Sequence, residues 1–462
     1  MRTKSNALIY LALSLLLGAL SACAQSSSQT NLPSDHDSSS TLLGHSATDR
    51  YWVSGQINVI GQGHPAFRAP YSGPNSLRPQ AEFDVSDVFT LYTGLELTPN
   101  SEVVLDVESA GGHGISDAHG LAGYTNLDVV RNPNLGAAPY VARLLVRRII
   151  PLSHEKAESD RGPLEFWGEL PVRRIEIVAG KFSLVDFSDN NAVGSDDHLQ
   201  FMNWAVDNNG AYDYAANTRG YTDGVMLEYD DRAWAIRFAE ALMPKVANGI
   251  HLDADIARAR SENIEFELDH GLLPGRKGAT RLLSFVNHAN MSNYREAIEQ
   301  YRAGLVSAPD VTLTRRQGRI KYGFGVNLEQ NLTHNLRAYV RWGRNLGRNE
   351  SFAYTEVDRT IAYGVDLRGS RWRRPDDRLG LTSVTNYISG DHREYLALGG
   401  LGFILADGKL NYGPERIIEG YDTFHLWRGL FASLDLQRVS NPGYNRDRGP
   451  VLVPAVRVHA DL

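Results

Sequence analysis

The sequence predicts an all-β protein: a single transmembrane antiparallel β-barrel of about 16 strands, with long loops at one rim and short turns at the other. Three observations support this prediction. Apolar and polar residues alternate with a period of two, the alternating segments run for roughly 9–12 residues, and the connections between them alternate between short and long. A tilted membrane strand needs that length, and bacterial barrels of this kind have an even number of strands.

The composition excludes several other classes of protein. The chain has 462 residues, of which 42% are hydrophobic and 22% charged, and it contains one cysteine. A single cysteine excludes a disulfide framework and a Cys-based zinc site. Beyond the N-terminus no apolar run approaches ~20 residues, which excludes a helical membrane protein. The formal net charge of −7 gives no electrostatic reason to bind nucleic acid.

The N-terminus reads as a secretory signal peptide over residues 1–24. Two basic residues precede a long apolar run, and small residues follow it. Two interpretations of its end stay open. The tripeptide Ala22-Cys23-Ala24 fits a cleavage site, whereas the residues that end at Cys23 resemble a lipoprotein signal, in which Cys23 would be acylated.

The rest of the chain divides into a spacer and one large domain. Residues 25–50 are rich in Ser, Asp and Thr and predict a disordered spacer. From 51 to 462 no second linker interrupts the pattern, so we expect one barrel domain over this range. A soluble core of that size would tend to split, whereas a barrel grows by adding strands.

The alternation can be followed in individual segments. Val103, Leu105 and Val107 share one strand face, and the acids at 102, 106 and 108 share the other. Such segments predict strands near 54–62, 83–97, 101–110, 140–150, 173–181, 221–229, 233–242, 262–270, 281–290, 318–329, 335–344, 359–368, 378–387, 415–426, 429–438 and 452–462. The long connections are expected at 63–82, 111–139, 182–220, 243–261, 291–317 and 388–414. The segment Ser292–Gly304 looks helical and is expected in one of these loops.

Several segments resemble the carbohydrate-selective porin family of bacterial outer membranes. They are GQIN at 55–58 with Phe67, PYSGPNSL at 70–77, AGGHGIS at 110–116, GLAGYTN at 120–126, AGKF at 179–182, DFSDNN at 186–191, QFMNW at 200–204, GAYDY at 210–214, TRGY at 218–221 and YNRDRGP at 444–450. The resemblance runs from about Tyr51 to Leu462. It implies a monomeric 16-stranded barrel in the outer membrane of a Gram-negative bacterium, surrounded by lipid, through which sugars and other small solutes diffuse into the periplasm.

Two features depart from the family pattern. Such barrels usually end in an aromatic residue, and this chain ends in Leu462, which would weaken targeting for assembly. An acylated Cys23 is not a family requirement. Two alternatives are retained: a barrel that conducts inorganic ions or organic acids, and an exported, lipid-anchored enzyme that acts on carbohydrates.

The loop at 182–220 is the best candidate for a segment that folds into the lumen. Hydroxyl-rich solutes need carboxylates, amides and guanidinium groups at a constriction. From this loop we expect the following residues to contact solute: Asp186, Asp189, Asn190, Asn203 and Arg219. The alternative for each of them is an ordinary solvated loop or a turn.

Charges on the predicted strands would set the field inside the pore. We expect Asp106, Glu108, Arg143, Arg147, Arg174, Glu176 and Lys181 to face the lumen. The alternative for Arg143, Arg147 and Arg174 is that they are structural charges of the barrel wall and do not act on a solute. The motifs of nucleotide-binding, hydrolytic and zinc enzymes are absent from the sequence. The sequence therefore predicts no enzyme, no cofactor and no metal site, including at the cluster His113, Asp117 and His119.

Overall fold

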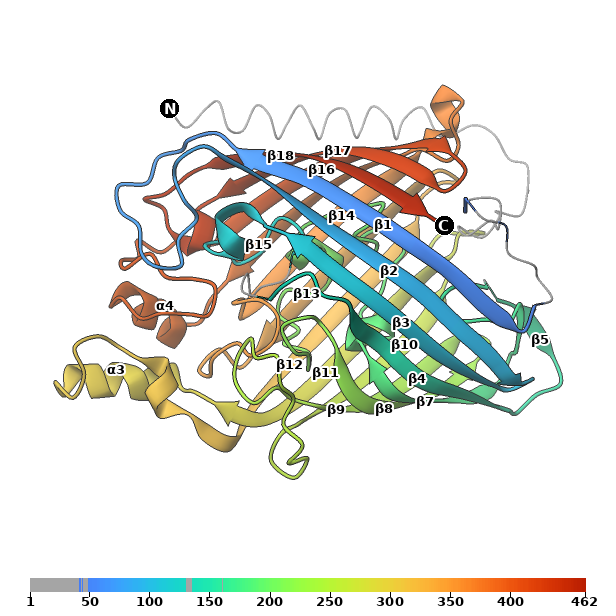
Figure 1. Ribbon diagram of the computed structural model, residues 1–462, viewed down its shortest axis with the longest axis horizontal. Helices are drawn as coiled ribbons and strands as arrows, with labels where there is room; N and C mark the ends of the chain where they lie inside the picture. Colours follow the sequence, from blue (N-terminus) through green and yellow to red (C-terminus); the bar gives the residue numbers. More distant parts are fainter. Residues whose placement is uncertain (1–40, 43, 45–48, 130–134, 160) are drawn as a thin grey trace. The chain divides into compact units, whose positions relative to one another are not determined.

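The computed structural model contains one closed antiparallel β-barrel, which begins at Tyr51 (Figure 1). It describes residues 41–462 except 43, 45–48, 130–134 and 160. The predicted signal peptide, with Cys23, lies outside the described residues, as does most of the predicted spacer 25–50.

Within the described residues the barrel has sixteen strands, and β1 (Tyr51–His64) closes the ring against β18 (Val451–Asp461). The others are β2 (Glu82–Thr98), β3 (Ser101–Gly112), β4 (Tyr140–Pro151), β7 (Arg174–Phe182), β8 (Thr222–Asp231), β9 (Trp234–Leu242), β10 (Arg260–His270), β11 (Gly278–Met291), β12 (Arg316–Asn331), β13 (Leu336–Asn345), β14 (Arg359–Arg368), β15 (Arg378–Tyr387), β16 (Glu415–Trp427) and β17 (Leu430–Ser440). This confirms the predicted fold class.

The two faces of the strands differ in the way the alternation predicts. On β12, Ile320, Tyr322 and Phe324 point outward and are exposed, whereas Lys321 and Asn327 point inward and are buried. Large apolar side chains are exposed on most of the other strands as well. So much exposed apolar surface suits contact with lipid and would be unfavourable in water.

The connections separate into two rims. Short turns join strand pairs such as β8–β9 and β16–β17, and long loops lie at the other rim with helices α3 (Tyr294–Arg302) and α4 (Gly390–Ala397) (Figure 1). Helix α3 confirms the helix expected within Ser292–Gly304. Among the described residues, no helix is long and apolar enough to cross a membrane.

One connection at the short-turn rim is unexpectedly long. Between β4 and β7 the chain forms a small two-stranded sheet of β5 (Lys156–Glu158) and β6 (Glu169–Pro171), at the opposite end of the barrel from α3 and α4 (Figure 1). Phe166, in the same insertion, is buried and stacks on Trp52 of β1 with ring centroids 6.3 Å apart. The insertion is therefore attached to the inner wall of the barrel.

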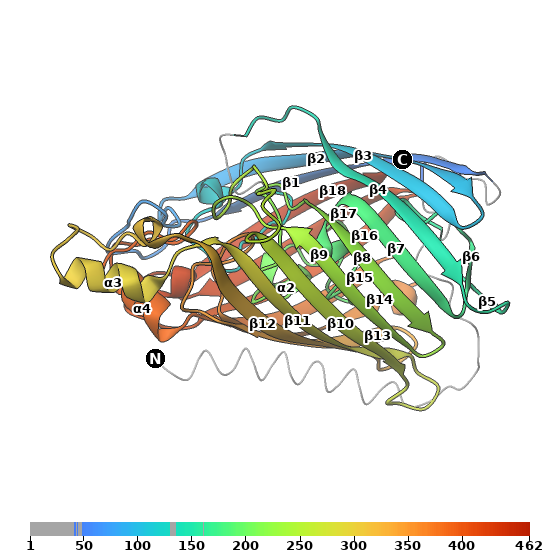
Figure 2. The same cartoon turned by 90° about the horizontal axis from the view of Figure 1, so that it is seen from below.

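Other loops enter the barrel and build an apolar core inside it. The short helix α2 (Trp204–Asp207) lies within the ring of strands (Figure 2). Trp204 stacks on Tyr354 at 5.7 Å and meets Tyr124 edge-on at 5.5 Å, so three separate loops contribute to this core. Short 3-10 turns complete the connections: η1 (Ile115–Ala118), η2 (Leu184–Asp186), η3 (Val311–Thr314), η4 (Gly369–Trp372) and η5 (Pro442–Tyr444). The inward loops therefore fill part of the lumen.

Candidate functional site

A cavity of about 260 Å³ lies in the lumen, between strands β1–β4 and the inward loops. The loop after β3 and the loop after β7 supply most of its wall. Its polar and aromatic lining residues include Gln56, Glu108, Asp128, Tyr140, Arg143, Asp186, Asn190, Asp197, His198, Trp204, Asp207, Asn208, Tyr214, Arg219, Tyr221 and Tyr354. This mixture of hydroxyl, amide, carboxylate and guanidinium groups can exchange hydrogen bonds with a polar solute.

Arg143 forms the basic part of this wall. Its Nη2 and Nε donate to the two carboxylate oxygens of Asp186, at 2.6 and 2.8 Å, and its Nη1 lies 3.3 Å from Asp106. A two-pronged pair of this kind holds the guanidinium in one orientation. Arg143 is therefore a fixed donor at the cavity and not a mobile surface charge.

Two tyrosines beside Arg143 are held by one carboxylate. The hydroxyls of Tyr140 and Tyr221 both donate to Glu108, the latter at 2.9 Å. The guanidinium of Arg219 lies 3.8 Å from the centre of the Tyr140 ring, and that of Arg143 lies 5.5 Å from the Tyr221 ring. Rings fixed in this way offer flat apolar faces beside charged donors.

The other part of the wall carries negative charge around one histidine. His198 Nε2 lies 3.5 Å from Asp128 and Nδ1 lies 3.7 Å from Asp197. Burial disfavours a charge on His198, but the two carboxylates outweigh it and raise its pKa to about 10. Burial also raises the pKa of the nearby Asp207 carboxyl well above its usual value, and the charge of Asp197 adds to the effect.

Three of the five residues expected to contact solute lie on the cavity. These are Asp186, Asn190 and Arg219. Asp189 and Asn203 are buried away from it, with 1% and 0% of their surface exposed. The structure therefore brings three of the five predicted residues together at the cavity. The other two, Asp189 and Asn203, make their contacts within the protein.

Asp189 and Asn203 hold the loop in place. Asp189 lies 3.1 Å from Arg341 Nε and accepts a hydrogen bond from the backbone of Asn209 at 2.7 Å. Burial raises the pKa of Asp189. Asn203 caps α2 by accepting from Ala205 N at 3.0 Å, and its amide donates to Gly123 O at 3.0 Å.

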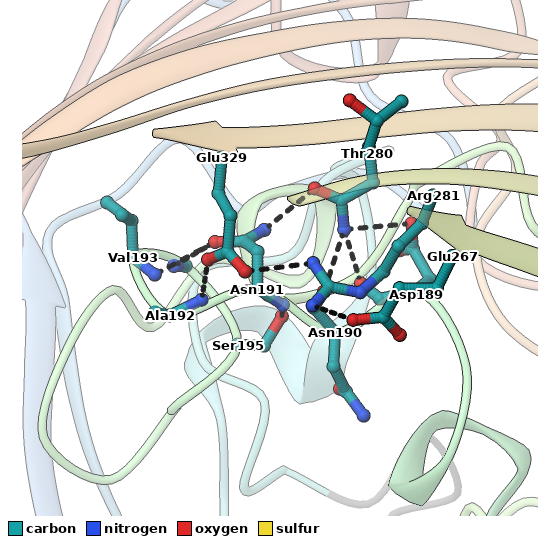
Figure 3. Close-up of polar contacts among 12 residues, drawn as sticks. Asp189, Asn190, Asn191, Ala192, Val193, Ser195, Glu267, Thr280, Arg281 and Glu329 are labelled. Carbon is teal, nitrogen blue, oxygen red and sulfur yellow. Dashed lines mark hydrogen bonds and ion pairs between the residues drawn. The ribbon is translucent and has the colours of Figure 1, made fainter. Parts of the chain in front are cut away.

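The tip of the same loop is anchored to the barrel wall (Figure 3). Glu329 on β12 accepts a hydrogen bond from the backbone of Ala192 at 2.6 Å and pairs with Arg281 at 3.0 Å. Arg281 on β11 also pairs with Glu267 at 2.8 Å. Asn191 closes the tip by accepting from Val193 N and from the next backbone amide. These contacts fix the loop against strands opposite the cavity lining.

Six of the seven charged strand residues that were expected in the lumen face inward, at the cavity or towards the short-turn rim. Glu108 and Arg143 line the cavity, and Asp106 lies behind Arg143. Towards the short-turn rim, Arg147 contacts Glu176, Glu165 and Glu102, and Arg174 lies 2.8 Å from Asp230. These side chains face inward, in a network that holds the wall and the β5–β6 insertion together.

Lys181 does not face the lumen. It pairs in register with Leu144 of β4 and Asp223 of β8, and Leu144 is an exposed, outward-pointing residue. Paired residues of neighbouring strands point to the same side of a sheet. The strict alternation along β7 already places Lys181 on the face of Ile175 and Ile177, so the expectation for this residue was wrong.

Several cavity residues were not singled out in the sequence. Asp128 comes from the loop after β3, whereas Asp197 and His198 are neighbours in the loop after β7, and no local spacing links Asp128 to them. Tyr140 and Tyr221 each follow the C-terminal end of a predicted loop, 111–139 and 182–220, and look there like any aromatic at a barrel rim. The alternation of apolar and polar residues predicts strand faces and cannot predict these contacts, because the proximity of the residues depends on how two loops fold inward.

Comparisons with known proteins agree with this architecture. The model of the carbohydrate-selective porin family, OprB family, matches residues 75–462. The high-pH structure of Pseudomonas putida OprB aligns with a TM-score of 0.66 at 14% identity, over 89% of this chain and 94% of that chain. Its low-pH structure aligns with a TM-score of 0.48 at 12% identity, over 89% and 92%. No curated protein matches the chain.

At 14% identity the high-pH structure shows the fold alone, while the family match carries the assignment. It covers most of the chain and nearly all of the barrel. The chain therefore belongs to the carbohydrate-selective porin family, OprB family, and is a non-enzymatic β-barrel channel of the Gram-negative outer membrane.

Proposed function

We propose that neutral sugars diffuse passively through this barrel and are selected at the lumen cavity. The observation that carries the proposal is the Arg143–Asp186 pair beside the two tyrosines that Glu108 holds. Guanidinium and carboxylate groups exchange hydrogen bonds with sugar hydroxyls, and an aromatic face covers the C–H side of the ring. Because each contact is made in water, the solute is released again.

The size of the cavity restricts the solute. Its volume of about 260 Å³ is below the ~300–1,000 Å³ typical of pockets for drug-sized ligands. We therefore propose a monosaccharide or a solute of similar size, and not an extended oligosaccharide. Charges of both signs on the wall favour a neutral polar solute over an ion of either sign.

The test is sugar block of single-channel current in a planar bilayer, with the variant Arg143→Gln. We expect glucose to reduce the current through the original protein and the variant to need at least a severalfold higher glucose concentration. Lys181→Gln is the matched control, because it also removes one positive charge but lies on the outward face. Equal block in all three proteins would place selection elsewhere.

A liposome-swelling assay separates the sugar from other solutes. Glucose should enter faster than amino acids or organic acids of similar size. If an organic acid enters faster, the channel selects anions, and Arg143 and Arg219 would be read as its anion-binding groups. Equal rates for all solutes of one size would remove the claim of selectivity.

We further propose that the channel works as a monomer and that residues 1–24 are its export signal. Support for the first comes from the family resemblance, and support for the second from the charged, apolar and small-residue order of the N-terminus. Light scattering in detergent tests the monomer. Mass spectrometry of the mature N-terminus tests the signal and shows whether Cys23 carries lipid.

A further inference from the structure

Three potential metal ligands meet at the acidic part of the cavity wall. Asp128 comes from the loop after β3, and Asp197 and His198 come from the loop after β7. One ligand atom from each of the three lies within 4.8 Å of the others. In the part of the chain that the structure describes, no other three His, Cys, Asp or Glu side chains meet in this way.

The distances are close to those of a metal centre. Donor atoms around a tetrahedral Zn²⁺ ion lie about 3.4 Å apart, since each is ~2.1 Å from the ion. His198 Nε2 and Asp128 Oδ1 are 3.5 Å apart. A carboxylate oxygen of Asp128 and one of Asp197 lie within 4.8 Å of each other. Two carboxylates this close need a shared proton or a cation between them.

A fourth side chain independently points to a ligand. Asn58 on β1 is fully buried, and its Nδ2 donates to Asp128, but its Oδ1 has no hydrogen-bond partner. A buried carbonyl without a partner costs about 1–3 kcal/mol. Because Oδ1 and Nδ2 share one carbon atom, Oδ1 lies beside the cluster, and a half-turn of the amide directs it to the carboxylates. A cation among these oxygens favours that orientation, as does a proton on Asp128, and a metal-binding measurement distinguishes the two.

We propose that Asp128, Asp197 and His198, completed by Asn58 Oδ1, bind a divalent transition-metal ion, with Zn²⁺ as the best match. An imidazole nitrogen combined with carboxylate oxygens suits Zn²⁺ better than Ca²⁺ or Mg²⁺, which take oxygen ligands alone. Asp128, Asp197 and His198 also line the cavity, so an ion can enter from the lumen and water can reach it.

The ion would join parts of the chain that are far apart in sequence. It would connect the loop after β3 to the loop after β7, and both to the barrel wall at Asn58. An imidazole binds a metal ion only without its extra proton, so Zn²⁺ would displace the proton that His198 carries between the carboxylates, and the wall would gain one net positive charge. Bound Zn²⁺ therefore stiffens the cavity wall and shifts the ion selectivity of the channel towards anions. This inference differs from the expectation of no metal site, and it does not depend on the identity of the solute.

The test is Zn²⁺ binding to the full-length, detergent-purified channel after treatment with a chelator. We expect one Zn²⁺ per chain by elemental analysis after dialysis. Isothermal titration should show at least tenfold weaker binding for Asp128→Asn and for His198→Gln. His288→Gln is the matched control, because it removes a histidine that lies 3.5 Å from Glu262 elsewhere on the barrel. This control should bind Zn²⁺ as the original protein does.

Heat-modifiable migration on a gel confirms that each variant is a folded barrel. Zn²⁺ should shift the ion selectivity of the original channel towards anions in a bilayer and leave that of His198→Gln unchanged. The proposal is overturned by substoichiometric binding, by equal affinity in all variants, or by equal loss in His288→Gln. Binding of Ca²⁺ that His198→Gln does not weaken would overturn the assignment to a transition metal. Sugar block is measured separately, so its failure and the failure of metal binding are distinguishable.

Discussion

Asp186 and Asp189 show how differently two acids of one loop are used. Asp186 accepts both prongs of Arg143 and lines the cavity. Asp189 has a left-handed backbone with φ of 64° and pairs with the fully buried Arg341. The first carboxylate sets the charge that a solute meets. The second neutralises a buried guanidinium and holds the loop.

Asp189→Asn should loosen the loop at 183–221. Removing one member of a buried ion pair costs on the order of 3–5 kcal/mol, because the other charge remains uncompensated. Asparagine tolerates the left-handed backbone, so the loss of charge is isolated from strain. We expect faster cleavage within 183–221 in limited proteolysis and a noisier open-channel current.

Asp186→Asn is the comparison for this prediction. It should shift ion preference towards anions, since Arg143 would lose a neutralising carboxylate, while cleavage of the loop stays at its original rate. If both variants were cleaved at the same rate, the division of roles between the two acids would be wrong.

At the scale of elements, one histidine connects the two helices of the long-loop rim. His392 of α4 is fully buried, with Nδ1 3.3 Å from Asp358 and Nε2 3.6 Å from Glu356. Its ring stacks on Tyr294 of α3, with centroids 4.3 Å apart. Burial disfavours its charge, but the two acids outweigh burial and raise the pKa of His392 to about 9. Burial raises the pKa of Tyr294 well above 10.

These shifts predict that the rim loosens in alkali. A histidine whose pKa is higher in the folded state stabilises the fold fully below its unfolded value of about 6.5. That stabilisation is lost as the pH rises through about 9. We expect a protease that is active at both pH 7 and pH 10 to cut the loop at 388–414 faster at pH 10. In His392→Gln the two rates should be similar, and the same pH dependence in the variant would rule out His392 as the cause.

At the scale of the whole molecule, the barrel has an apolar outside and a charged inside. Phe324 on β12 is 53% exposed, and its inward neighbours in the strand are polar or glycine. Lipid contacts this apolar outer surface. Hydrogen bonds between neighbouring strands pair the backbone N–H and C=O groups of the barrel. The stability of the barrel therefore depends on the membrane as much as on its own contacts.

Phe324→Arg should destabilise the barrel in lipid vesicles. An arginine on the lipid face costs roughly 2–4 kcal/mol near the middle of the bilayer. Urea unfolding followed by heat-modifiable migration measures this loss. Phe324→Ala, which removes the ring without adding charge, should cost clearly less. Equal stability of the arginine variant and the original protein would mean that this face does not contact hydrocarbon.

The architecture of this protein follows from the local pattern of its residues. Glu102, Asp106 and Glu108 alternate with apolar residues, and this period of two specifies both faces of a strand locally. The strand positions, the two kinds of rim and helix α3 follow from such local patterns. The same pattern, read strictly, also puts Lys181 outside.

Which polar residues meet in the lumen depends on how the loops fold into the barrel. Asp186 and Asp189 look alike in the sequence, and nothing local distinguishes Asn203 from Asn190. Asp128 reaches His198 only because two loops turn inward and contact the same wall. Strand orientation is a local property of the backbone, whereas the path of a loop depends on contacts between residues far apart in the chain.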